Sequence, residues 1–116
     1  MFKFEKLEVW KKVVDLAHEV HLLTRNWPKE EMYSLTSQIK RASDSVSLNI
    51  AEGSTGQSDK EFSRFLGIAL RSCIEVVSCI HLAIRRKYIT QNQFDEVYSR
   101  CEEGIKMIQS FRNKLK

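Results

Sequence analysis

A chain of 116 residues fits a single domain that can bury a modest core without metals or disulfides. Its balance of 42% hydrophobic and 29% charged residues excludes a disordered chain, and one proline with four glycines favours long helices over many short strands. The formal net charge of +4 is compatible with a nucleic-acid partner, and it is also compatible with ordinary solubility.

No targeting signal is evident. The opening residues MFKFEKLEVWKK carry charges every few positions and lack the apolar segment of a signal peptide, and no run approaches the ~18 apolar residues of a membrane span. Cys73, Cys79 and Cys101 form an odd set without CxxC spacing, which favours reduced thiols. We therefore expect a cytoplasmic protein without a membrane partner.

Apolar residues three and four positions apart predict two helices in the first half of the chain. The first should span residues 5–26, and Pro28 then suits the first turn of a second helix at residues 29–52. Gly53 fits the left-handed position that often ends a helix. The expected buried stripes are Trp10, Val13, Ala17, Val20 and Leu23 on the first helix and Met32, Leu35, Ile39, Ala42, Val46 and Ile50 on the second.

Two capping boxes predict where the next helices begin. Ser58 with Glu61 opens a helix that should run to about Lys87, and Thr90 with Gln93 opens the last one. The expected stripes are Phe62, Leu66, Ala69, Cys73, Val76, Ile80 and Ala83, followed by Phe94, Val97, Cys101, Ile105, Ile108 and Leu115. Four amphipathic helices of ~20 residues with short connections predict an all-α fold, an up-down-up-down antiparallel four-helix bundle that forms a single domain over residues 1–116.

The second and third helices each carry a further patterned face, which predicts a subunit interface. On the third helix, apolar residues fall more than about 100° from the centre of the core stripe, and on the second a face of small and charged residues lies about 120° from it. The residues expected in the interface are Arg41, Ser45, Leu48, Glu52, Ile68, Ile74, Glu75 and Leu82. The alternative is an ordinary solvated surface, because scattered exposed apolar residues are common.

The chain resembles a known family in four segments that occur in the family's order: LEVWKKVVDLAHEVHLLT, PKEEMYSLTSQIKRA, LNIAEG and KEFSRFLGIALRSCIE. The signature R-A-x-x-S-x-x-x-N-I-A-E-G is present as Arg41, Ala42, Ser45, Asn49, Ile50, Ala51, Glu52 and Gly53. The family is that of four-helix-bundle proteins encoded in intervening sequences of bacterial 23S ribosomal RNA, also called ribosomal S23-like. The resemblance implies an up-down bundle that assembles as a homopentamer. A related accessory protein of retroelements is a pentamer that binds nucleic acid through a basic surface.

The chain departs from the family pattern at three positions. Ser47 replaces the usual proline before the Asn-Ile-Ala-Glu-Gly element, and Leu48 replaces the small residue that follows it. Arg71 stands where a glycine is often found, before Ser72. We expect the loss of proline to straighten the second helix slightly and Arg71 to crowd a close helix contact.

Metal and catalytic sites are not expected. Asp15 and His18 superficially resemble the carboxylate-histidine element of di-iron bundles, but such sites need two elements and further carboxylates, and His81 stands alone. Cys73 and Cys101 occupy core positions and should pack as small apolar residues. No activated nucleophile and no phosphate-binding glycine loop is present. We therefore expect no metal, no cofactor, no small-molecule substrate and no enzymatic activity.

Basic residues of the third helix predict a phosphate-binding surface. The residues expected to contact nucleic acid are Lys60, Arg64, Arg71, Arg85, Arg86 and Lys87. Repetition of these cations around a homo-oligomeric ring would multiply a weak contact. No aromatic platform accompanies them, which indicates sequence-independent backbone contact. The alternative is a solvated charged face that Glu61 and Glu75 interrupt.

The leading hypothesis is therefore a non-enzymatic homo-oligomer, a pentamer by resemblance, that acts as a scaffold for RNA or DNA. The rival hypothesis is an adaptor that binds only proteins. Salt-dependent binding of nucleic acid would distinguish the two, because neutralised phosphates make affinity fall steeply with added salt.

Overall fold

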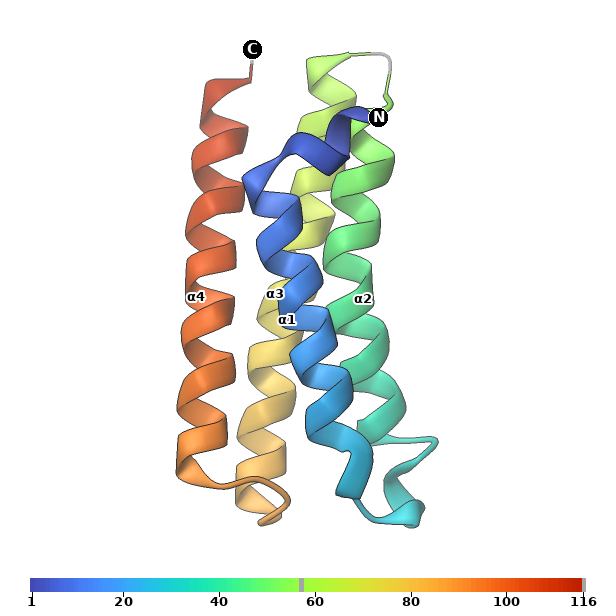
Figure 1. Ribbon diagram of the computed structural model, residues 1–116, viewed down its shortest axis with the longest axis vertical. Helices are drawn as coiled ribbons and strands as arrows, with labels where there is room; N and C mark the ends of the chain where they lie inside the picture. Colours follow the sequence, from blue (N-terminus) through green and yellow to red (C-terminus); the bar gives the residue numbers. More distant parts are fainter. Residues whose placement is uncertain (57, 116) are drawn as a thin grey trace.

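The computed structural model describes residues 1–56 and 58–115, and within them every regular element is a helix. Successive long helices run in alternate directions, so the chain folds as an up-down-up-down bundle of 43 × 23 × 22 Å (Figure 1). The α-helices are α1 (Glu8–Leu23), α2 (Leu35–Ser54), α3 (Asp59–Arg85) and α4 (Gln91–Lys114), and short 3-10 turns are η1 (Lys3–Lys6), η2 (Thr24–Asn26) and η3 (Lys29–Glu31). α1 and α3 each pack against both α2 and α4.

The predicted stripes form one continuous core. Apolar residues three and four positions apart on each helix meet at the bundle axis, where burial removes them from water and stabilises the fold. The largest fully buried side chains include Leu16, Ile39, Ile50, Leu66, Ile80 and Ile108. Five residues expected in these stripes are only half-buried at the edge of the core: Trp10, Leu23, Phe94, Ile105 and Leu115.

The predicted ends of the first two helices are wrong. Leu7 is extended and separates η1 from α1, and α2 begins at Leu35 rather than at residue 29. Because the Glu31 carboxylate accepts hydrogen bonds from the Tyr88 hydroxyl (2.7 Å) and the Leu35 amide (3.3 Å), the chain turns across the end of the bundle there. Met32, predicted in the core, is consequently 48% exposed.

Gly53 does not end α2, contrary to the prediction. α2 continues to Ser54, and no glycine in the described part of the chain has a positive φ. A Cβ atom at Gly53 would lie 2.6 Å from the Cβ of Phe65 and 3.0 Å from Cδ1 of Phe62. Gly53 is therefore required because α2 and α3 approach closely where they meet.

The caps of α3 and α4 follow the predicted boxes with one exception. The Ser58 hydroxyl accepts from the Glu61 amide at 3.1 Å, but the Glu61 carboxylate binds Arg64 instead of returning to Ser58. The Thr90 box is complete, since the Thr90 amide donates to Gln93 Oε1 at 2.8 Å and the Gln93 amide donates to Thr90 Oγ1 at 3.1 Å.

α3 ends in a Schellman motif. The amide of Tyr88 donates to the Ala83 carbonyl at 2.9 Å, and the amide of Lys87 donates to the Ile84 carbonyl at 3.0 Å. Lys87 occupies the left-handed position of this motif with φ 65°, where glycine is usual.

By length and composition, α3 is also long and apolar enough to cross a membrane. No unbroken run of ~18 apolar residues occurs in α3, so the sequence predicted no membrane span. The mean hydropathy of an 18-residue window of α3 is nevertheless high, because apolar residues outside the buried stripe add to it. Long core helices of water-soluble bundles meet the same criterion, and α3 contributes eight residues to the core.

Candidate nucleic-acid interface

The predicted phosphate-binding residues fall into two groups along α3. Lys60, Arg64 and Arg71 are exposed in its first half, and Arg85, Arg86 and Lys87 are exposed at its end. Fourteen residues separate Arg71 from Arg85, which corresponds to about 21 Å along a helix. The fold therefore does not bring the two groups together.

Two members of the first group, Arg64 and Arg71, join an arginine of α4 in what we call the three-arginine groove, lined by Arg64, Gly67, Leu70, Arg71 and Arg112. Lys60 does not line this groove. The groove has a volume of about 390 Å³ and lies where α3 packs beside α4. Because Gly67 has no side chain, the Arg112 guanidinium lies across it, and a Cβ there would be 3.3 Å from Arg112 Nη2.

Two of the three guanidiniums lack an acidic partner among the described residues. Arg64 is matched by Glu61, whose Oε2 lies 2.7 Å from Nη2, and it also stacks over the Phe65 ring at 4.7 Å. Neither Arg71 nor Arg112 makes an ion pair with any described carboxylate. Arg112 is half-buried, and its Nε donates to Ser63 Oγ at 3.4 Å. The groove thus holds unneutralised positive charge on forked donors suited to phosphate.

The second group is engaged differently. Arg86 Nη1 lies 3.1 Å from Glu31 Oε2, so its charge is already matched within the chain. The Lys87 backbone is part of the Schellman motif, whereas the side chains of Arg85 and Lys87 are exposed and make no ion pair with a described carboxylate. The hydrogen bond from Tyr88, followed by smaller contributions that include Arg86, holds the pKa of Glu31 below its usual range. The contacts of Glu31 with Arg86 and Tyr88 hold the segment between α1 and α2 against the end of α3.

Sequence reasoning did not single out Arg112. The available signal was Gly67, an interior helical glycine placed three residues after Arg64 and four before Arg71. A glycine in the middle of a helix destabilises it and often marks a place where another group approaches closely. Which group approaches is decided by the packing of α4, and no local pattern of α4 indicates it.

Three of the predicted interface residues line a polar cleft between α2 and α3 of about 300 Å³. Arg41, Ser45 and Glu75 lie together there. The Ser72 hydroxyl donates to Ser45 Oγ at 3.0 Å, and Gln38 Nε2 donates to Glu75 Oε2 at 3.1 Å. Glu75 is thus bonded across the helix pair and makes no ion pair with Arg71.

The other predicted interface residues differ in exposure. Leu48 is 64% exposed, Ile74 50% and Leu82 44%, which are large values for apolar side chains. Glu52 is also exposed, whereas Ile68 is half-buried. At about 100° per residue, Ile74 lies on the side of α3 toward α4 and Leu82 on its outer side, so the two do not form one patch.

The cysteines and histidines do not assemble a reactive site. All three cysteines are buried and free, and burial, with a smaller contribution from Glu75, raises the pKa of Cys79 to about 11. His18 is exposed, and His21 Nε2 lies 3.0 Å from Asp44 Oδ1. Within residues 1–56 and 58–115, no group of three or more metal-ligating side chains is placed to hold an ion.

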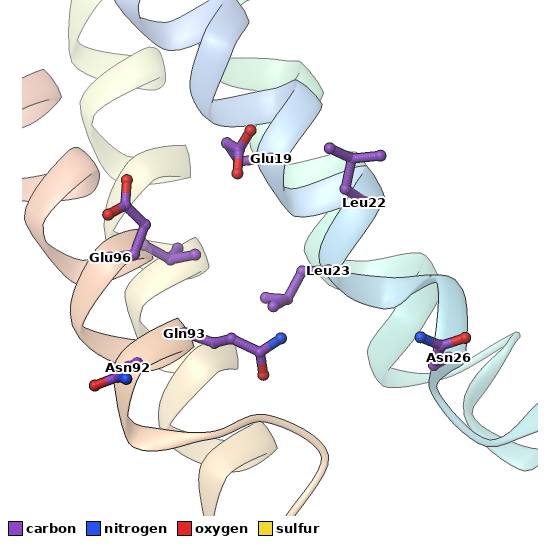
Figure 2. A pocket seen from close by; sticks show the side chains of 8 residues that line it. Glu19, Leu22, Leu23, Asn26, Asn92, Gln93 and Glu96 are labelled. Carbon is purple, nitrogen blue, oxygen red and sulfur yellow. The ribbon is translucent and has the colours of Figure 1, made fainter.

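An open crevice of about 330 Å³ lies between the end of α1 and the start of α4. Figure 2 shows Glu19 and Glu96 on facing helices, with Leu23 and Gln93 pointing toward each other below them. The Glu96 carboxylate accepts from Arg100 Nε at 2.8 Å. The lining combines the carboxylates of Glu19 and Glu96 with amide and apolar side chains.

Comparison with known proteins places this bundle in a family. The family model for 23S rRNA-intervening sequence proteins matches residues 5–110. The chain belongs to this family. It is also similar to a crystal structure of a protein of unknown function from the S23 ribosomal protein family of Bacteroides thetaiotaomicron. That similarity has a TM-score of 0.81 and 27% sequence identity over 90% of this chain and 97% of the other.

Family membership confirms the resemblance recognised in the signature and its flanking segments. No curated protein matches the chain. Neither the family description nor the structural relative names a reaction. The signature residues Ser45 and Gly53 lie where α2 meets α3, so part of the family pattern encodes helix packing.

Proposed function

We propose that this protein is a non-enzymatic, self-associating four-helix bundle that binds RNA or DNA through the phosphate backbone at the three-arginine groove. The observation that carries this proposal is that Arg64, Arg71 and Arg112 line one groove, in which the Arg112 guanidinium lies over Gly67. Arg71 and Arg112 have no carboxylate partner in the described part of the chain. An arginine fork can donate two parallel hydrogen bonds to one phosphate, so two such forks form a phosphate site.

Contact with the backbone rather than with bases is supported by the lining of the groove. It contains no aromatic side chain on which a base would stack. The neighbouring ring of Phe65 is already covered by the Arg64 guanidinium. Phosphate contacts position a nucleic acid without reading its sequence, so binding should be sequence-independent.

Self-association would give a weak site useful strength. The exposure of Leu48, Ile74 and Leu82 supports a protein partner for the α2 and α3 surfaces. The family resemblance recognised in the signature implies a homopentameric ring. Several grooves in one assembly would engage one strand at high effective concentration.

Fluorescence anisotropy with a labelled single-stranded RNA tests the binding proposal. We expect affinity for the wild type to fall steeply with salt. Arg71→Gln/Arg112→Gln should flatten the log–log slope by about 0.7 for each phosphate that the variant no longer neutralises. Lys11→Gln/Lys106→Gln removes the same charge outside the groove and is the matched control. Both lysines are exposed on other faces of the bundle.

Two results would overturn the binding proposal. The first is an absence of RNA binding at low salt by an intact oligomer, which would favour the adaptor that binds only proteins. The second is an equal reduction of affinity in the groove variant and the control variant, which would attribute binding to net charge alone.

Sedimentation equilibrium tests self-association independently. The wild type should be oligomeric at micromolar concentration, and Leu48→Asp should dissociate it because a carboxylate cannot be buried without a partner. Leu22→Asp, on the exposed face of α1, is the control that should leave assembly unchanged. A monomeric wild type would remove the multivalent part of the proposal.

A further inference from the structure

A cavity of about 450 Å³ lies at the end of the bundle where the chain crosses from α1 to α2, the lower end in Figure 1. Its wall combines the last turn of α1, the connecting segment and the first half of α2. The volume is within the range of small-molecule sites. None of its lining residues belongs to the three-arginine groove, so the inference does not depend on the proposed function.

Two polar atoms of residues that line the cavity are buried and have no hydrogen-bond partner within the described chain. They are the indole Nε1 of Trp27, a residue that is only 8% exposed, and the hydroxyl of Thr36. A buried polar group without a partner is unfavourable and rare in native proteins. Because an indole N–H can only donate, the partner that satisfies Trp27 must be an acceptor.

The charged residues of the lining are all basic. Arg25, Lys29 and Lys40 contribute to the cavity, and no aspartate or glutamate does. None of these three cations is ion-paired to a carboxylate among the described residues. His21 also lines the cavity, and its ring is held by Asp44 at 3.0 Å. Charge and hydrogen-bond donors therefore both select an anion.

The N-terminal end of α2 also favours an anion in this cavity. Thr36 is the second residue of α2, in the turn whose free amides carry the positive end of the helix dipole. The N-cap residue Ser34 makes no side-chain hydrogen bond to these amides, of which the Leu35 amide already donates to the Glu31 carboxylate at 3.3 Å. An anion bound beside Thr36 would face this helix end as well as the side chains.

Apart from Thr24, the rest of the lining is apolar. Trp27, Pro28 and the half-exposed Met32 form this part of the wall. A bare inorganic anion would leave these surfaces in contact with water, whereas a ligand with an apolar body would cover them. The exposure of Met32, which the sequence pattern assigned to the core, fits this interpretation.

We propose that this cavity binds a small organic anion, a phosphate group carried on a flat apolar body. The Trp27 indole and the Thr36 hydroxyl donate to its oxygens, Lys40 and the neighbouring cations neutralise its charge, and Met32 covers its apolar part. The same chemistry occurs in a free phosphate ester and in the terminal nucleotide of a nucleic acid.

Two-dimensional NMR of the full chain, carrying Trp10→Phe so that Trp27 supplies the remaining indole signal, tests this assignment with phenyl phosphate as the probe. We expect the Trp27 indole resonance to move and to saturate with phenyl phosphate. Inorganic phosphate should bind more weakly, and benzyl alcohol, which lacks the charge, should leave the resonance in place. A 5′-phosphorylated dinucleotide, compared with its unphosphorylated form, tests the nucleic-acid source of the same group.

Two variants check which residues bind the probe. Lys40→Gln and Thr36→Val should each weaken binding of phenyl phosphate about tenfold, because each removes one hydrogen-bonded or charged contact. Lys11→Gln should bind like the parent, and far-UV circular dichroism checks that all variants are folded. An unmoved indole resonance at millimolar phenyl phosphate, an equal response to benzyl alcohol, or unchanged binding in both Lys40→Gln and Thr36→Val would overturn the proposal.

Discussion

Gly53→Ala tests how closely α2 and α3 pack at the end of the family signature. The added Cβ would lie 2.6 Å from the Cβ of Phe65, an atom fixed to the α3 backbone that no rotamer change can move. The helices must therefore separate, or the two phenylalanine side chains at this contact must shift. We expect the substitution to lower the free energy of unfolding.

The magnitude follows from two opposing effects. Overpacking a well-packed contact destabilises the fold by about 1–3 kcal/mol, whereas the higher helix propensity of alanine stabilises it by at most about 1 kcal/mol. The stabilisation from helix propensity is smaller here, because Gly53 is the second-to-last residue of α2. The net loss should be about 1–2 kcal/mol, which corresponds to a fall in Tm of roughly 4–8 °C for a chain of this size.

Gly104→Ala is the matched control. A Cβ at Gly104 would meet Val13 Cγ1 at 3.4 Å and Cys73 Sγ at 3.8 Å, which are ordinary contacts. This variant should be more stable than the wild type by about 0.5–1 kcal/mol, because alanine favours the helix. Urea unfolding followed by circular dichroism measures both variants. The packing argument fails if Gly53→Ala is as stable as Gly104→Ala.

Three further substitutions test other features. Lys87→Gly should raise the free energy of unfolding by about 1 kcal/mol in thermal melts, since φ 65° is strained for lysine; equal or lower stability would contradict this. Glu31→Gln should flatten the pH dependence of the urea midpoint. The pKa of Glu31 is lower in the folded than in the unfolded protein, so Glu31 stabilises the fold at pH values above its unfolded pKa of about 4. This stabilisation is lost as the pH falls through the pKa of Glu31 in the folded protein. Parallel profiles for wild type and variant would show that the hydrogen bond from Tyr88 has no such effect. Arg112→Gln alone should weaken RNA binding without unfolding the protein, and unchanged anisotropy would remove Arg112 from the site.

Much of the fold was predictable because the predictive signals are local. Spacings of three and four specify which face of each helix is buried, and Thr90 with Gln93 marks a helix start through contacts three residues apart. The predictions failed where a distant residue intervened. Glu31 turns the chain because Tyr88, 57 positions later, donates to it, and Gly53 is required because Phe65 of another helix lies against it.

The candidate site was only partly predictable for the same reason. Arg64 and Arg71 share a face of one helix, so the sequence pattern placed them together. Arg112 joins them through the packing of α4 on α3, and Arg86 is matched by Glu31 through their contact at the end of the bundle. The positions of basic residues along the chain do not distinguish cations that are paired within the fold from cations that are free to bind a partner.

The amino-acid sequence by itself determined the all-helical class, most of the core and the family of this protein, because each depends on periodicity or on a motif read along one segment. The tertiary structure decided which arginines line one groove, why Gly53 is glycine and where Trp27 is left with an unpaired donor. These properties arise between segments far apart in the chain, and they exist only after the hydrophobic faces have packed and set the distances between the side chains at their edges.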